Sequence, residues 1–128
     1  MTIRVLKNRP FARWAKSEQL TDKALCAAAR EIESGLIDAR LGGFLLKKRV
    51  AKAHKGKSGG LRTIVAHRQG SRLIFLFGFA KRDRENIEPD EKRALHKLGE
   101  VYMSKTNPQI NELVKERILL ELQCDGKD

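Results

Sequence analysis

The alternation of apolar and polar residues predicts a strand and two helices in the first part of the chain. Residues 2–6 alternate with a period of two, which predicts a short strand. Apolar residues at helical spacing follow Pro10 and predict a short helix, and Thr21 with Asp22 predicts the start of a longer one. We expect that helix to end near Gly35, because glycine adopts the left-handed conformation common at helix ends.

After Gly43 the pattern changes to the period of strands. Residues 44–50, 61–68 and 72–80 predict three strands, the last two joined by a short polar loop that is typical of an antiparallel hairpin. The third strand is apolar on both faces, so we expect it at the centre of the sheet. Its aromatic residues alternate and are expected on one face of the strand, where they are interpreted as core residues rather than as an RNA-stacking platform; they are Phe75, Phe77 and Phe79.

Two more helices are predicted after the strands, because Pro89 and Pro108 each begin an amphipathic run. The second helix is expected over residues 108–121. The order of elements predicts an α+β fold with a small antiparallel-rich β-sheet, made of the N-terminal strand and a three-strand meander. Two N-terminal helices are expected to pack on this sheet, and C-terminal helices complete the domain.

The composition indicates one globular domain. The chain has 128 residues, of which 41% are hydrophobic, enough to bury a core. No apolar run approaches the ~18 residues of a membrane span, and the N-terminus lacks a secretion signal. We therefore expect a cytoplasmic protein without a membrane partner. Cys26 and Cys124 form no disulfide framework and suit a reduced compartment, so no structural disulfide is expected.

The positive charge is concentrated in the middle of the chain. The formal net charge is +11. Residues 1–40 hold 8 basic and 5 acidic residues, residues 41–87 hold 12 and 2, and residues 88–128 hold 7 and 9. A local excess of this size would repel itself unless a polyanion offsets it. This distribution favours a nucleic-acid or phosphate partner over an ordinary solvated surface.

The predicted meander gathers these charges at one end of the sheet. In an antiparallel hairpin the start of one strand lies beside the end of the next, with neighbouring strands ~4.8 Å apart. Arg62 is therefore expected beside residues 78–81, and the loop 51–60 should reach the same end. The cations expected to converge there are Lys48, Lys57, Arg62, Lys81, Arg82 and Arg84, with Arg49, Lys52 and His54 close by. Guanidinium groups can grip a phosphate with two hydrogen bonds, so this cluster suits phosphoryl chemistry.

Other chemical motifs are weak. The three histidines and two cysteines have no metal-ligand spacing, so we expect no metal and no cofactor. Residues 56–58 resemble the end of a phosphate-binding P-loop, but Ala51 stands where that motif needs glycine. His54 is the one histidine placed for acid–base chemistry, because it lies in the basic loop.

Two motifs together resemble those of a known family. They are Gly-Lys-Ser-Gly-Gly-x-Arg-Thr at residues 56–63 and Gly-Phe-x-Lys-Arg at residues 78–82. With residues 45–51 and 83–87, they resemble the RelE/ParE superfamily of bacterial type II toxins, specifically its HigB-like RelE branch. The resemblance implies an mRNA interferase that cleaves messages in the ribosomal A site until a cognate antitoxin binds. We expect a RelE-like toxin domain over residues 1–105, with residues 106–128 as its C-terminal helical extension and tail.

The resemblance also implies roles for individual residues. Arg62 would hold the charge of the phosphorane formed when the RNA 2′-hydroxyl attacks the adjacent phosphate. Lys57 or Lys48 would act as base or electrostatic partner, and Lys81 or Arg82 would serve the leaving oxygen. Arg49, Lys52, His54 and Arg84 would bind RNA. Where RelE has a tyrosine beyond the basic pair, this chain has Ile87-Glu88, and its only tyrosine is Tyr102, so the base and acid stay open.

The sequence is also consistent with two other functions. The ParE side of the superfamily implies a non-catalytic inhibitor of DNA gyrase, and the charge alone is consistent with an RNA-binding module. The cations at the strand ends favour cleavage, which would need no metal. A small helix-turn-helix protein is the expected antitoxin.

Overall fold

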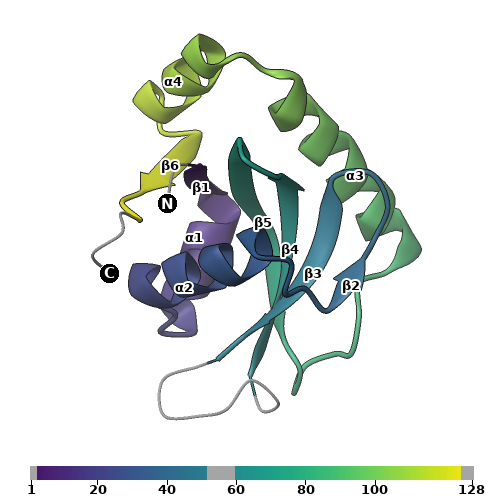
Figure 1. Cartoon of the computed structure of the whole chain (residues 1–128). Helices are drawn as coiled ribbons and strands as arrows, with labels where there is room; N and C mark the ends of the chain where they lie inside the picture. Colours follow the sequence, from purple (N-terminus) through teal and green to yellow (C-terminus); the bar gives the residue numbers. More distant parts are fainter. Residues whose placement is uncertain (1–2, 52–59, 125–128) are drawn as a thin grey trace.

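The computed structural model describes residues 3–51 and 60–124. The strands are β1 (Arg4–Asn8), β2 (Ala39–Arg40), β3 (Leu45–Val50), β4 (Leu61–Arg68), β5 (Arg72–Ala80) and β6 (Leu119–Leu122). The helices are α1 (Arg9–Ser17), α2 (Asp22–Glu33), α3 (Pro89–Ser104) and α4 (Asn107–Lys115). The strands form one sheet in the order β2-β3-β4-β5-β1-β6 (Figure 1).

The predicted α+β fold and its strand meander are confirmed. β3, β4 and β5 pair antiparallel in sequence order, and β4 and β5 have the predicted bounds. The first strand begins two residues later than predicted and lies parallel to β5. Its neighbouring residues Val5 and Leu6 are both buried, on opposite faces of the sheet. β1 is therefore an interior strand.

Each face of the sheet packs against its own helices (Figure 1). On one face, α1 and α2 bury Phe11, Leu25 and Ile32 against the strands. On the other face, α3 and α4 bury residues such as Met103 and Ile110. Burial of apolar area on both sides stabilises the central strands, and the face that carries α3 is called the α3 face below.

Side-chain caps fix where the helices begin. The Asn8 side chain accepts a hydrogen bond from the Phe11 N–H at 2.8 Å, and its amide donates to the Leu76 carbonyl at 3.0 Å. Thr21 caps α2 as its sequence position predicts, accepting from the Ala24 N–H at 3.1 Å. The Asn8 side chain therefore joins the start of α1 to β5.

The predicted helix over residues 108–121 is wrong beyond Lys115. Arg117 adopts a positive φ of 61°, which ends the helix, and the chain then enters β6. β6 pairs antiparallel with β1 and buries Leu119 and Leu122. If these residues continued the helix, they could not pair with β1, and Leu119 and Leu122 would not cover this edge of the sheet.

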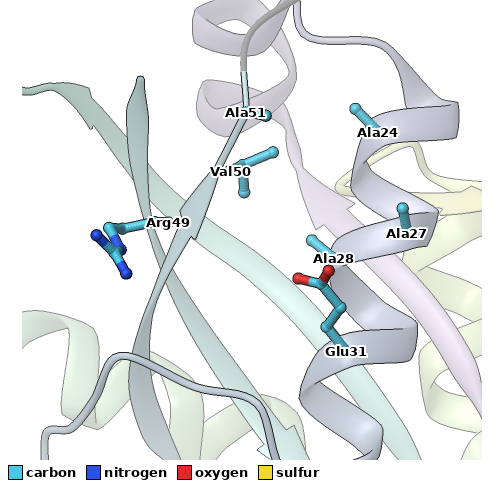
Figure 2. A pocket seen from close by; sticks show the side chains of 7 residues that line it. All are labelled: Ala24, Ala27, Ala28, Glu31, Arg49, Val50 and Ala51. Atoms are coloured by element: carbon cyan, nitrogen blue, oxygen red, sulfur yellow. The ribbon is translucent and has the colours of Figure 1, made fainter. Parts of the chain in front are cut away.

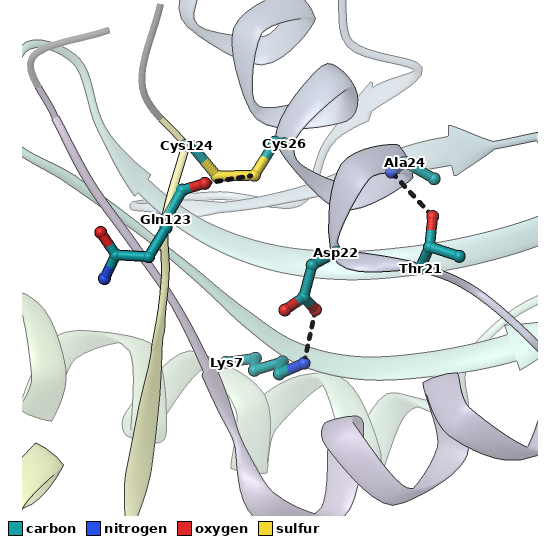
Figure 3. The surroundings of a disulfide bond; sticks show 7 residues. All are labelled: Lys7, Thr21, Asp22, Ala24, Cys26, Gln123 and Cys124. Carbon is teal, nitrogen blue, oxygen red and sulfur yellow. Dashed lines mark hydrogen bonds and ion pairs between the residues drawn. A yellow bond between two sulfur atoms is a disulfide. The ribbon is translucent and has the colours of Figure 1, made fainter. Parts of the chain in front are cut away.

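The expectation of no structural disulfide is also wrong, because Cys26 of α2 is bonded to Cys124 (Figure 3). The two residues are 98 positions apart, and their Cα atoms are 5.4 Å apart. The pairing of β6 with β1 brings the end of the described chain beside α2. The disulfide therefore joins the segment that follows β6 to the helix layer on the face opposite α3.

Among the described residues, no helix is both long enough and apolar enough to cross a bilayer.

Candidate functional site

Three neighbouring strands each place one residue in a row across the end of the sheet. Arg49 of β3 lies opposite Arg62 of β4, which in turn lies opposite Phe79 of β5. Strands lie ~4.8 Å apart, so the row spans about 10 Å. Phe79 belongs to the core on the α3 face, and Figure 2 shows the Arg49 side chain leaving β3 on the side away from α2. The row therefore lies on the α3 face, and Arg62 lies where the meander predicts it.

Arg49 has its own counter-ion at the edge of the sheet. Asp38 accepts from the Arg49 Nε at 2.7 Å and from the Arg49 backbone N–H at 2.6 Å. Burial alone would raise the pKa of Asp38, but these two hydrogen bonds and the charges of Arg49 and Lys48 lower it overall. Asp38 thus stays ionised and holds Arg49 in place.

Arg62 differs from Arg49 because part of its guanidinium is buried without an acceptor. Its Nη1 atom has no hydrogen-bond partner within the described ranges. An unsatisfied buried donor costs about 1–3 kcal/mol, and more when the group is charged. Like charges directly opposite each other, as at Arg49 and Arg62, are also unfavourable. An anionic oxygen bound at this point would relieve both costs.

Lys81 follows β5 directly and continues the same end of the sheet. Its backbone N–H donates to the Gly60 carbonyl at 3.4 Å, which extends the pairing of β4 with β5 by one residue. Its side chain is exposed and forms no ion pair with any residue in the described part of the chain. Lys81 is therefore a second cation available to a bound anion.

Arg82 and Arg84 are engaged by carboxylates on opposite sides of the sheet. Arg82 donates from Nη2 to Glu18 at 2.9 Å, and Glu18 lies at the end of α1. Arg84 donates from Nη1 and Nη2 to Glu91 of α3 at 2.9 and 2.8 Å. The hydrogen bonds from Arg84 lower the pKa of Glu91. The structure thus separates these two arginines, although they are only two positions apart.

Lys48 reaches the expected end of the sheet but points into the opposite layer. Its side chain is only 5% exposed, and Nζ lies 2.7 Å from Glu31 of α2. The same ammonium donates to the Leu36 carbonyl at 2.9 Å. Alternation along β3 separates Lys48 from its neighbour Arg49, so the expected convergence of Lys48 with Arg62 on one surface is wrong.

The remaining sequence candidates divide into two groups. Lys52, His54 and Lys57 lie outside the described residues. Tyr102 of α3 lies in the core between this helix and the sheet, and burial raises the pKa of its hydroxyl. In residues 3–51 and 60–124, no three histidine, cysteine, aspartate or glutamate residues form a group that could hold a metal.

The sequence did not identify Phe77, Phe79 and Glu91 as part of this site. A β-bulge changes the register, so that Ile64 opposes Phe77 while the next residue, Val65, opposes Phe75. Phe75 consequently faces α1, where it stacks on Phe11, and the expectation that all three phenylalanines share one face is wrong. Phe77 and Phe79 remain on the α3 face, with their ring centroids 6.4 Å apart.

The chain matches a known protein family. A family model described as the RelE toxin of the RelE/RelB toxin–antitoxin system matches residues 3–122, which include every strand and helix described above. No curated protein sequence matches the chain.

Proposed function

The chain belongs to the RelE family of toxins from toxin–antitoxin systems, and from this premise we propose that it is an endoribonuclease that cleaves messenger RNA. The proposed reaction needs no metal and takes place in the A site of the ribosome, where it stops translation. Within the superfamily, the motifs at residues 56–63 and 78–82 support the HigB-like branch. The antitoxin that inhibits it is proposed to be a helix-turn-helix protein.

The observation that carries this proposal is the contrast between Arg62 and the other cations at this end of the sheet. Four of them have carboxylate partners: Lys48 with Glu31, Arg49 with Asp38, Arg82 with Glu18, and Arg84 with Glu91. Arg62 keeps a buried Nη1 without an acceptor in the described part of the chain, between Arg49 and Phe79. A backbone phosphate of RNA supplies the missing acceptor and the missing negative charge.

The proposed reaction begins with attack of the RNA 2′-hydroxyl on the adjacent phosphorus. The 2′-oxygen forms a bond to phosphorus, the bond from phosphorus to the 5′-oxygen breaks, and the products are a 2′,3′-cyclic phosphate and a 5′-hydroxyl. Arg62 stabilises the negative charge of the phosphorane, and this charge is larger in the transition state than in the ground state. Lys81 supplies positive charge or a proton to the departing 5′-oxygen.

Neither Arg62 nor Lys81 is proposed as the base that removes the 2′-hydroxyl proton. Lys57 stays the candidate from the sequence. Lys48 is a poorer candidate, because its ammonium is buried against Glu31 on the other face of the sheet. The ribosome would order the message, so the protein contributes few groups and a large share of the rate comes from positioning.

The test is to map the cut sites and the chemistry of the ends after incubation of the protein with programmed ribosomes. We expect cleavage within the A-site codon, with cyclic phosphate and 5′-hydroxyl ends. Cleavage of free RNA at high protein concentration should persist when a chelator removes divalent metals. Intact messages together with inhibited DNA supercoiling by gyrase would instead support the ParE-like function. Binding of RNA without cleavage of either substrate would leave only an RNA-binding module.

A further inference from the structure

The guanidinium of Arg84 lies over two aromatic rings, one of which belongs to the cross-strand neighbour of Arg62. Its guanidinium carbon is 5.2 Å from the ring centroid of Phe77 and 5.4 Å from that of Phe79. Both distances are within the ~6 Å range of a cation–π contact. Phe79 is the direct cross-strand neighbour of Arg62, and the Cβ atoms of such pairs are ~4.5–5.5 Å apart. The stacked arginine therefore lies next to the proposed phosphate position.

The Glu91 carboxylate already occupies two of the five N–H groups of Arg84. Both terminal nitrogens donate to the Glu91 carboxylate, so the guanidinium is held in one plane and its charge is matched. Glu91 is itself fixed, because it accepts from the Glu88 backbone N–H at 2.7 Å in the capping box that begins α3. Because this carboxylate already matches its charge, Arg84 is a weaker ligand for phosphate than Arg62, whose Nη1 has no acceptor in the described part of the chain.

What Arg84 still offers is a planar surface. The guanidinium lies over the phenylalanine rings on one side, and 32% of the side chain is exposed. Planar guanidinium groups and aromatic rings are the surfaces on which proteins stack the unpaired bases of RNA. Phe79 itself is only 5% exposed, so it offers little ring surface to a base directly.

We propose that Arg84, supported by Phe77 and Phe79 and fixed by Glu91, is the stacking platform for a nucleobase next to the cleaved phosphate. This inference rests on the proposed function, because it assigns a position to a base of the same RNA substrate. Arg84 is then a positioning residue. It sets where the nucleotide lies relative to Arg62, and its contribution is insensitive to salt because its charge is already paired.

The experiment uses a short RNA that carries 2-aminopurine on either side of the cleavage site and a 2′-deoxy sugar that blocks cleavage. Stacking quenches 2-aminopurine fluorescence, and quenching measured at saturating protein is independent of affinity. We expect strong quenching by the wild type for one label position and loss of most of it in Arg84→Ala. RNA affinity should fall roughly 5- to 150-fold, the range of one base stack.

Two variants separate stacking from a purely structural role. Glu91→Gln keeps the capping box, since glutamine also serves at that position, but releases the charge of Arg84. It should weaken quenching and steepen the salt dependence of RNA binding by up to ~0.7 in log–log slope, as for one added phosphate contact. The matched control is Arg93→Lys, also on α3 and paired with Asp90, which should leave quenching unchanged.

Undiminished quenching in folded Arg84→Ala or in Glu91→Gln would overturn the platform, and so would absence of quenching in a wild type that cleaves messages. Arg62→Ala provides the distinction from the proposed function, because it should lose cleavage of ribosome-bound RNA and retain quenching. A wild type that quenches 2-aminopurine but never cleaves would contradict the proposed function and support the platform alone.

Discussion

Replacement of Lys48 by methionine should lower the stability of the protein but leave cleavage by the folded enzyme intact. Methionine keeps most of the buried side-chain volume and removes the ammonium that bridges Glu31 and the Leu36 carbonyl. The Leu36 carbonyl loses its donor, and because this hydrogen bond is only partly buried, the cost should be near the lower end of the ~1–3 kcal/mol of a buried acceptor. The side chain of Glu31 is 34% exposed, so water can replace part of its interaction with Lys48. We therefore expect a loss of stability smaller than the ~3–5 kcal/mol that breaking a fully buried ion pair costs.

We therefore expect a total loss of about 2 kcal/mol, which lowers Tm by roughly 6–10 °C for a chain of this size. The assay is urea unfolding of Lys48→Met and wild type, together with kcat on programmed ribosomes at a temperature where both are folded. Lys47→Met, on the neighbouring position of β3, is the matched control and should change stability by less than about 0.5 kcal/mol. Normal stability with kcat lowered a hundredfold would refute the reasoning and return Lys48 to the role of base.

Three further outcomes follow from the packing. Gly78→Ala should destabilise the fold by about 1–3 kcal/mol in thermal unfolding, because an added Cβ would lie 2.2 Å from the Trp14 ring. Cys26→Ser should lower the free energy of unfolding by about 2–4 kcal/mol under oxidising conditions. With a reductant present the wild type loses the same disulfide, so the two proteins should then be equally stable. Asp38→Asn should reduce the pH dependence of the free energy of unfolding below pH 4, measured by urea unfolding at a series of pH values. Hydrogen bonds from Arg49 lower the pKa of Asp38 in the folded state. Ionised Asp38 therefore stabilises the folded protein above its unfolded-state pKa, and this stabilisation is lost as the pH falls through its folded-state pKa.

The parts of the fold that the sequence predicted are those with strong local periodicity. β4 and β5 were predicted to the residue because a long apolar run and a polar hairpin loop leave little choice of register. β6 was missed because its four residues follow a helical run without a proline or glycine to separate them. Its burial depends on β1, more than a hundred positions earlier in the chain. The disulfide was missed for the same reason.

The candidate site shows a similar division. Strand pairing was sufficient to place Arg62 beside the end of β5, since this follows from the hairpin alone. The partners that separate Lys48 and Arg82 from Arg62 could not be predicted, because Glu31 and Glu18 come from helices on the other face. The stacking of Arg84 on Phe77 and Phe79 depends on a β-bulge, which no residue pattern in the strand indicates.

The central claim is that the guanidinium of Arg62 stabilises the phosphorane, and kcat of Arg62→Ala on programmed ribosomes tests it most directly. Removal of one such donor costs about 3–4 kcal/mol in the transition state, so kcat should fall roughly 10²- to 10³-fold with an unchanged fold. Arg62→Lys should restore little of it, because an ammonium keeps the charge without the planar fork. A folded Arg62→Ala protein that cleaves messages at the wild-type rate would contradict the account.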